Sequence, residues 1–351
     1  MTSAPGSTKS PERASAAVRG ANGTVDFAMT MSPPELAAHL FGTGFEALRI
    51  EGARPLHTVP FTTFEHPDAR RALERAEVLI TAWGAPPLSD ADLDSAPRLR
   101  YLLYAGGQGA ILLPESARER GIQVSNAGWL NAIPVAEFTV AMIVLANKRA
   151  FEANRMYRRR RARIDREIEF PQAGNRGKTV GVVGASRIGR IVIERLRGMD
   201  LHVQVYDPYL DAAEAARLGV TPLALDELMR SSDIVTLHPP LNTSTAGMIT
   251  AELLALLPDG ATLINTSRGA IVDQTALLDE LRTGRIEAIL DVTVPEVLPR
   301  DSELYTLPNV FLTPHISGSM GTEIGRLGEH VATELERIVL GQPLAFPEEL
   351  P

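Results

Sequence analysis

The sequence contains no cysteine and no hydrophobic run long enough to cross a bilayer. Without cysteine there is no disulfide framework, no catalytic thiolate and no zinc site with cysteine ligands, which fits a reducing compartment. The longest apolar stretch, over residues 135–146, is interrupted by Glu137 and falls short of the roughly 20 apolar residues that a membrane span needs. We therefore expect a cytoplasmic protein without a membrane partner, and we predict no metal site.

A basic face is missing as well. The net charge is −8 and the isoelectric point lies near 5.5, which argues against a nucleic-acid partner. Residues 1–23 lack the apolar segment of a secretory signal. Their serine, alanine, glycine and proline content predicts a disordered tail.

The 351 residues present are enough for two domains of about 150 residues each. Residues 24–130 alternate strand-like apolar runs with helical segments, which is typical of a parallel sheet. Ser89 is a candidate helix N-cap. The strand at 100–104 ends in the glycine-rich cluster 105–109. The expected strands are 24–31, 75–83, 100–104 and 122–125, and the expected helices are 33–41 and 89–94.

The sequence pattern predicts one long helical stretch over residues 131–163. Its first half is almost wholly apolar and is expected to be buried, whereas its second half is strongly basic. Such a run is usually a solvated helix face, and an anion or partner site is the alternative. The basic residues are Arg155, Arg158, Arg159, Arg160, Arg161 and Arg163.

After a linker-like break at 171–177, strands and helices alternate again. This second region therefore predicts another parallel sheet. Its expected strands are 179–183, 202–206, 234–237, 262–265, 288–291 and 310–312, and its expected helices are 188–197, 226–230, 251–257, 274–283 and 321–340.

A glycine pattern joins the first strand and helix of the second region. Gly184, Ser186 and Gly189 follow the spacing G-x-G-x-x-G, with serine in place of the middle glycine. Asp207 ends the next strand, where an acidic residue can bind an adenosine ribose and repel a 2′-phosphate. The amide groups at the helix N-terminus suit a pyrophosphate. The pattern favours NAD over NADP, and a purely structural turn is the alternative.

Three later strands each end near a chemically reactive side chain. Arg268 follows one, Asp291 and Glu296 follow the next, and His315 follows the last. Singly, each has an ordinary explanation as an ion-pair partner, a solvated carboxylate or a structural histidine. Together they indicate a site, because ligands bind at the carboxyl ends of strands in open α/β sheets.

From about residue 98 to 340 the chain closely resembles the D-isomer-specific 2-hydroxyacid dehydrogenases. The resemblance is carried by several motifs in order, among them ERGIQVSNA, VGVVGASRIGR, INTSRGAIVD and LPNVFLTPHISGS. It implies two doubly wound, Rossmann-like or flavodoxin-like parallel-sheet domains, with the cofactor in the cleft between them. The substrate domain would be discontinuous, over 24–150 and 319–351, and the NAD-binding domain would be 151–318.

The resemblance also implies roles for individual residues. His315 would be the general acid/base, since imidazole exchanges protons near neutral pH. Glu296 would hold the other ring nitrogen, and Arg268 would bind the substrate carboxylate and polarise its carbonyl. Arg187 and Ile188 would sit at the pyrophosphate of NAD. The nicotinamide half would be lined by Pro239, Thr245, Thr266 and Asp291.

The substrate loop departs from the family pattern A-G-x-G-x-D-N-I-D. Residues 105–113 read AGGQGAILL, so the second glycine is Gln108 and both acidic positions are apolar. Backbone amides of Gly106, Gly107 and Gln108 are still expected to bind a small anionic substrate. Phosphoglycerate is a less favoured substrate for this reason. For Trp83 and Trp129 the sequence leaves two alternatives, a position at the cleft or a position in the core.

Three functions follow as hypotheses. The first is an NAD-dependent dehydrogenase or reductase that interconverts a D-2-hydroxy acid and its 2-keto acid. The second is a dehydrogenase of an unusual small anion, such as a phosphonate alcohol or phosphite, suggested by the altered loop. The third is an NAD-sensing binding protein resembling transcriptional corepressors. The apolar segment 131–150 also predicts a homodimer, since family members usually dimerise through this region.

Overall fold

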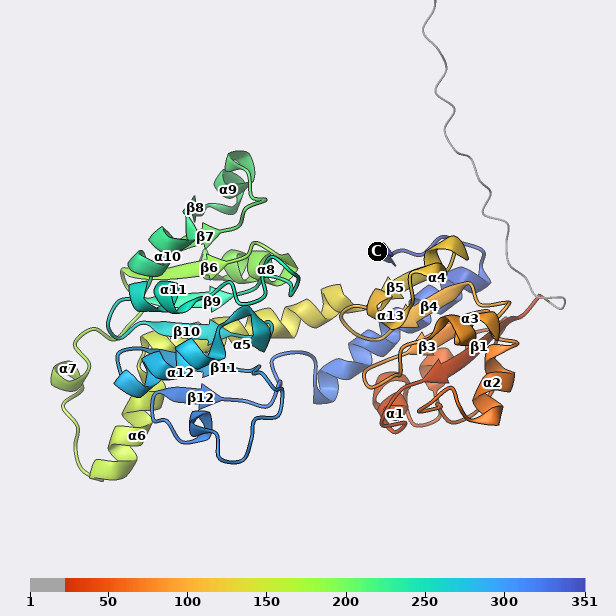
Figure 1. Cartoon of the computed structure of the whole chain (residues 1–351), viewed down its shortest axis with the longest axis horizontal. Helices are drawn as coiled ribbons and strands as arrows, with labels where there is room; N and C mark the ends of the chain where they lie inside the picture. Colours follow the sequence, from red (N-terminus) through yellow and green to blue (C-terminus); the bar gives the residue numbers. More distant parts are fainter. Residues whose placement is uncertain (1–22, 351) are drawn as a thin grey trace, which may run out of the picture. The chain divides into compact units, whose positions relative to one another are not determined.

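The computed structural model describes residues 23–350, which form two compact units (Figure 1). One unit extends to Leu130 and resumes at Gly321, and the other covers Asn131–Met320. The sequence analysis predicted the domain boundaries after residues 150 and 318. The division at 130 falls inside helix α5 (Gly128–Asn147), so one continuous helix belongs to both units. Except for Gly23, the tail expected over 1–23 lies outside the described residues.

The first unit is built on a six-stranded sheet in the order β13-β5-β4-β3-β1-β2. The strands β1 to β5 are parallel and have the flavodoxin-like order 2-1-3-4-5. The two-residue strand β13 is antiparallel to β5. In Figure 1 helix α13 (blue) lies among the red and orange elements, and its contacts with α1 place it there. The strands are β1 (Val25–Thr30), β2 (Ala53–Pro55), β3 (Val78–Thr81), β4 (Tyr101–Tyr104), β5 (Gln123–Asn126) and β13 (Pro347–Glu348).

Among the described residues, four short α-helices and one long α-helix complete this unit. The long α13 contributes a buried face that includes Leu327, Val331 and Leu335. Ser89 caps α3 as predicted, in a capping box with Asp92. The elements are α1 (Leu36–Phe41), α2 (Pro67–Leu73), α3 (Asp90–Asp94), α4 (Ser116–Glu119), α13 (Ile324–Val339) and the 3-10 turn η2 (Ala110–Leu112).

The second unit has a seven-stranded parallel sheet in the order β12-β11-β10-β9-β6-β7-β8. Counted from its first strand, this is the Rossmann order 3-2-1-4-5-6 with a seventh strand added. The predicted fold class is therefore confirmed. The strands are β6 (Lys178–Val183), β7 (Leu201–Tyr206), β8 (Thr221–Pro222), β9 (Ile234–Leu237), β10 (Thr262–Asn265), β11 (Glu287–Leu290) and β12 (Val310–Leu312).

Continuous apolar runs account for the central strands of this sheet. Every residue of β9 and β10 is buried, as expected where helices cover both faces of a parallel sheet. Helix α8 buries Val192, Ile193 and Leu196 in the same core. The helices are α6 (Ala150–Arg160), α7 (Arg166–Glu169), α8 (Arg187–Leu196), α9 (Ala212–Leu218), α10 (Leu225–Ser231), α11 (Ala251–Leu256) and α12 (Gln274–Thr283).

The prediction of one helical stretch over 131–163 is wrong at Arg149, where α5 ends and α6 begins. Arg149 has φ 54°, a left-handed conformation that interrupts a right-handed helix. Its guanidinium pairs with Glu152 at 2.8 Å and with Glu287 at 3.4 Å. These contacts hold the break, and Glu287 comes from a distant strand.

Helix α5 is long and apolar enough to cross a membrane by length and composition, which the shorter run 135–146 did not suggest. One side of it instead packs in the core of the second unit, where Ala136, Ile143 and Ala146 are buried. The other side is exposed at Glu137, Ala141 and Leu145. The expectation that this segment is wholly buried is therefore wrong for one face.

Candidate functional site

The predicted catalytic residues follow neighbouring strands of the second unit. Arg268 follows β10, Asp291 and Glu296 follow β11, and His315 follows β12. These strands are parallel neighbours, so their carboxyl ends meet at one edge of the sheet.

His315 and Glu296 form a direct pair. The Nδ1–H of His315 donates to Oε1 of Glu296 at 2.5 Å. A carboxylate can only accept here, so the bond assigns the proton to Nδ1 and leaves Nε2 as the free ring nitrogen. The two side chains remain 46% and 56% exposed, so Nε2 can reach a molecule from solvent. This is the arrangement of an acid/base imidazole with an orienting carboxylate.

Backbone strain marks the same histidine. His315 has φ 54°, an uncommon conformation for a residue other than glycine. The buried carboxylate of Asp291 holds the loop in place: it accepts from Thr313 Oγ1 at 2.6 Å, from Ile316 N at 2.8 Å and from Ser317 N at 2.9 Å. The backbone carbonyl of Asp291 also accepts from His315 N at 3.0 Å. Asp291, expected at the nicotinamide, is thus occupied in positioning the histidine loop.

Arg268 has no carboxylate partner within ion-pair distance in residues 23–350. Its side chain is exposed, and Nη1 donates only to the neighbouring Ser267 carbonyl at 2.7 Å. The availability of this planar group of donors suits an anionic ligand.

Gly269 brings the Arg268 loop against the Glu296 loop. A Cβ at Gly269 would lie 2.4 Å from the carbonyl carbon of Thr293. Thr293 in turn donates through Oγ1 to the carbonyl of Glu296 at 3.2 Å. Only glycine permits this approach, and the contact couples the positions of the guanidinium and the carboxylate.

The glycine turn after β6 has the geometry that its spacing predicts. Gly184 has φ 92°, and a Cβ there would lie 2.8 Å from Pro239 N. A Cβ at Gly189 would lie 2.1 Å from the Gly184 carbonyl oxygen. Both positions therefore require glycine, the first for the turn and the second for close helix–strand packing.

Ser186 replaces the middle glycine by acting as the N-cap of α8. Its Oγ accepts from Gly189 N at 3.4 Å, and its backbone is extended at φ −63°. The amides of Arg187 and Ile188, in the first turn, donate to no other group of the described chain. Two donors at a helix N-terminus remain available to a phosphate, so the turn fits a dinucleotide.

Asp207 lies at the end of β7 beside this turn. Its Oδ2 accepts from Ala185 N at 2.7 Å and its Oδ1 from Tyr209 N at 2.8 Å. A carboxylate has about four acceptor sites, so ribose hydroxyls can still bind.

The remaining predicted cofactor residues lie at the ends of β9 and β10. The Pro239 carbonyl accepts from Ser267 Oγ at 2.7 Å, and Thr266 Oγ1 lies 3.0 Å from Thr139 Oγ1 of α5. Thr245 belongs to the loop after β9 and donates to the Pro240 carbonyl at 2.6 Å. These contacts fix the loops around the same sheet edge.

One residue of this edge was missed by the sequence analysis. His238 follows β9, is 3% exposed, and lies 3.0 Å from Thr236 Oγ1 through Nε2. Burial lowers its pKa to about 3, so it is neutral. The signal available was its position directly before Pro239, within a strand end that also packs against Gly184 and Gly189.

The predicted substrate loop lies in the first unit, after β4. The amides of Gly106, Gly107 and Gln108 donate to no other group of the described chain. Among the described residues, three successive donors are therefore left for an anion. Trp83 is half-buried, and Trp129 stacks on Phe346 with ring centroids 4.9 Å apart, which places it in a packed aromatic cluster.

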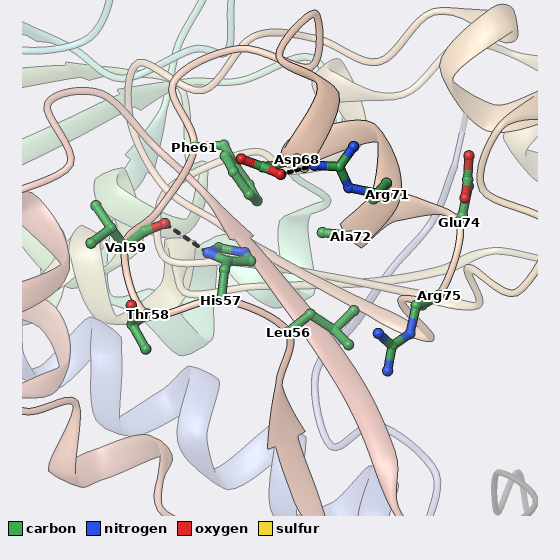
Figure 2. A pocket seen from close by; sticks show the side chains of 10 residues that line it. All are labelled: Leu56, His57, Thr58, Val59, Phe61, Asp68, Arg71, Ala72, Glu74 and Arg75. Atoms are coloured by element: carbon green, nitrogen blue, oxygen red, sulfur yellow. Dashed lines mark hydrogen bonds and ion pairs between the residues drawn. The ribbon is translucent and has the colours of Figure 1, made fainter.

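A separate hollow of about 500 Å³ lies beside β2 and α2 (Figure 2). At its centre the Nδ1–H of His57 donates to the Val59 carbonyl at 2.7 Å, and Asp68 pairs with Arg71. None of the predicted site residues lines it. Within residues 23–350 no group of three or more histidine and carboxylate side chains could hold a metal ion.

Together these features define a two-unit α/β protein with a dinucleotide-type turn and a histidine–carboxylate pair at the same sheet edge. Residues 140–317 match the D-isomer specific 2-hydroxyacid dehydrogenase, NAD binding domain, and the chain belongs to this family. The cofactor of this domain is NAD.

Relatives and a solved structure support the assignment. The chain is 36% identical to the D-3-phosphoglycerate dehydrogenase of Mycobacterium leprae over 77% of this chain and 51% of the relative. It is 35% identical to the glyoxylate reductase of Korarchaeum cryptofilum over 71% of this chain and 76% of that protein. The TT0316 protein from Thermus thermophilus has a TM-score of 0.75 at 29% identity, covering 93% of this chain and all of that one. The chain spans about half the length of the phosphoglycerate dehydrogenases it matches.

Proposed function

We propose that this protein is an NAD-dependent oxidoreductase that interconverts a D-2-hydroxy acid and its 2-keto acid. The observation that carries the proposal is the 2.5 Å bond between His315 Nδ1 and Glu296 Oε1, on a strained loop at the carboxyl edge of the sheet. Strained backbone at a pair of titratable groups is typical of a catalytic centre.

In the reducing direction His315 holds the proton that the reaction consumes. Bound NADH would supply the hydride for C2 of the keto acid. Protonated His315 then donates its Nε2 proton to the carbonyl oxygen, so the C=O bond becomes CH–OH. Glu296 stabilises the imidazolium before that transfer and keeps Nε2 directed outward afterwards.

Charged and amide donors would bind the substrate carboxylate. Arg268 supplies a guanidinium without another carboxylate partner in the described chain. The amides of Gly106, Gly107 and Gln108 are the further proposed ligands. An anion held by several donors is fixed in orientation, which is what hydride transfer to one face of a carbonyl needs.

The chain's own residues also favour NAD over NADP. Arg187 and Ile188 amides would bind the pyrophosphate, and Gly184, Ser186 and Gly189 shape the turn. Asp207 would accept from the ribose hydroxyls and repel a 2′-phosphate. Pro239, Thr245, Thr266 and Asp291 would flank the nicotinamide half.

The test is purified protein with NADH and a panel of 2-keto acids, from glyoxylate and hydroxypyruvate to branched and aryl acids. We expect NADH oxidation with at least one of them. Absence of turnover with the whole panel would count against the proposal, and turnover restricted to a phosphonate substrate would favour the unusual-anion alternative.

We further propose a homodimer formed through the region 131–150. The exposed face of α5 is apolar at Ala141 and Leu145, with Leu145 37% exposed, and Phe138 and Val144 are only half-buried. Sedimentation should give twice the chain mass of 37.9 kDa, and Leu145→Glu should give the monomer. A wild-type monomer at micromolar concentration would contradict this. The cytoplasmic location stays a prediction.

A further inference from the structure

The glycine loop of the first unit depends on a carboxylate from a distant part of the chain. Oε2 of Glu348 accepts from Gly109 N at 2.9 Å and from Ala110 N at 3.2 Å. It also accepts from Asn126 Nδ2 at 2.7 Å. One oxygen therefore receives three N–H donors, two of them from the loop that carries Gly106–Gln108.

The geometry at Gly109 makes this contact specific. A Cβ at Gly109 would lie 2.9 Å from Tyr104 Cβ and 3.0 Å from Val124 Cγ1, so the loop is packed closely over β4 and β5. The loop then turns directly into η2, whose N-cap is Gly109. Because the first amides of a helical turn lack partners within it, an external carboxylate satisfies them.

The loop has no acidic residue of its own for this purpose. Residues 105–113 contain no aspartate or glutamate, and Ala110 and Leu113 stand at the two positions where the family pattern has an acidic residue. The carboxylate that Gly109 and Ala110 bind comes instead from Glu348, more than two hundred residues away. The loop therefore depends on a residue outside it for a carboxylate acceptor.

The segment that carries Glu348, residues 344–348, is itself anchored. The buried Glu334 of α13 accepts from Ala345 N at 3.0 Å and from Phe346 N at 3.0 Å. Phe346 stacks on Trp129, and β13 pairs with β5. Glu348 is therefore held by backbone pairing, a buried carboxylate and an aromatic contact.

A second hydrogen bond extends the arrangement beyond the loop. Asn126 donates to Glu348 through Nδ2 and accepts from Gly128 N through Oδ1 at 2.8 Å. Gly128 begins α5. The carboxylate thus fixes both the glycine loop and the start of that helix.

We propose that Glu348 is a positioning residue for substrate binding: its carboxylate holds residues 106–110 so that the amides of Gly106, Gly107 and Gln108 face the substrate carboxylate. This rests on the proposed function for the role of those amides. The holding of the loop by Glu348 does not depend on it.

The experiment compares wild type with Glu348→Gln, Glu348→Ala and the matched control Glu349→Ala, since Glu349 is the exposed neighbour. Two readouts are needed: steady-state kinetics with NADH and the best 2-keto acid, and backbone hydrogen exchange of the peptide that contains Gly109 and Ala110. Circular dichroism and thermal melting establish that each variant is folded. Glu348→Gln keeps the shape of the side chain if Glu348→Ala fails to fold.

We expect Glu348→Ala to raise the KM for the keto acid about tenfold while the KM for NADH stays unchanged, because misplaced amides weaken binding of the carboxylate. Glu348→Gln should have a smaller effect of the same kind, since an amide oxygen accepts more weakly than a carboxylate. Exchange at Gly109 and Ala110 should accelerate in both variants and not in Glu349→Ala.

A keto-acid KM within twofold of wild type together with unchanged exchange would overturn the proposal. Faster exchange with an unchanged KM would overturn the substrate role. If wild type reduces no keto acid, the proposed function fails, and with it the substrate role. The exchange measurement alone then decides whether Glu348 holds the loop.

Discussion

At the scale of single residues, His238 is a neutral imidazole buried directly after β9, at the carboxyl edge of the sheet of the second unit. Its pKa of about 3 lies far below the ordinary 6.5 because burial disfavours the charged ring. The unfolded chain binds a proton here as the pH falls through 6.5, whereas the folded chain does not. Stability from this group is therefore complete above 6.5 and is lost toward acid.

The low pKa of His238 predicts a measurable slope of the free energy of unfolding against pH. Between about pH 6.5 and pH 4 the free energy of unfolding should fall by about 1.4 kcal/mol per pH unit through His238. His238→Gln should remove that part of the slope in denaturant titrations. Burial also lowers the pKa values of His57 and His330. Wild type and His238→Gln both contain these two histidines, so the difference between their slopes is due to His238. Parallel slopes in the two proteins would contradict the prediction.

Asp207 is the residue that should decide cofactor choice. Its charge lies beside the turn that would bind the pyrophosphate, and it accepts from the Ala185 amide. Asp207→Asn keeps a shape that can accept this bond but removes the charge. We expect wild type to prefer NADH over NADPH, and the variant to lose about tenfold of that preference in kcat/KM.

The matched control is Asp200→Asn, because Asp200 is exposed before the start of β7 and therefore at the opposite end of that strand. Asp200→Asn should leave the ratio of kcat/KM with NADH to kcat/KM with NADPH unchanged. A ratio unaffected by Asp207→Asn would show that this carboxylate does not face the ribose.

At the scale of elements, the strand–turn–helix around Gly184 depends on one close approach. A methyl group at Gly189 would lie 2.1 Å from the Gly184 carbonyl oxygen, so β6 and α8 must separate. We expect Gly189→Ala to destabilise the protein by about 1–3 kcal/mol, as overpacking does, and to abolish NADH binding.

Gly198→Ala is the control for that experiment, since no atom lies within 4 Å of the place that its methyl group would occupy. Thermal melting and fluorescence titration with NADH measure both effects. An NADH affinity within twofold of wild type in Gly189→Ala would contradict the close-packing explanation of the turn.

Elements with strong local signals could be predicted from the sequence. The strands β9, β10 and β12 and helix α12 have the predicted bounds, because each is an apolar or periodic run between turn residues or caps. The break at Arg149 could not be predicted, because Glu287 of a distant strand contributes to it. Strand β13 is too short to have a period, and it is defined by its pairing with β5.

In the candidate site, too, some features could be predicted from the sequence and others depend on tertiary contacts. The resemblance identified His315, Glu296 and Arg268, and the structure brings Glu296 and His315 into contact across 19 residues. The supporting contacts were not visible in the sequence. Asp291 holds the His315 loop through three side-chain hydrogen bonds, and Glu348 reaches the glycine loop from the other end of the chain. Such contacts depend on tertiary structure and have no local pattern.

At the scale of the whole molecule, the proposed site residues are distributed over the two units. The second unit carries the turn that is proposed to bind NAD and the His315–Glu296 pair, and the first carries the glycine loop with its three available amides. The proposed reaction requires contributions from both.

The most direct test of that reaction is NADH oxidation by wild type and His315→Gln with the same 2-keto acid, alongside NADH affinity for each. We expect His315→Gln to lower kcat by about 10²–10⁴-fold, because the proton donor is lost, while NADH affinity stays within twofold. Equal turnover by the two proteins would contradict the assignment of His315 as the acid/base residue, and with it the proposed mechanism.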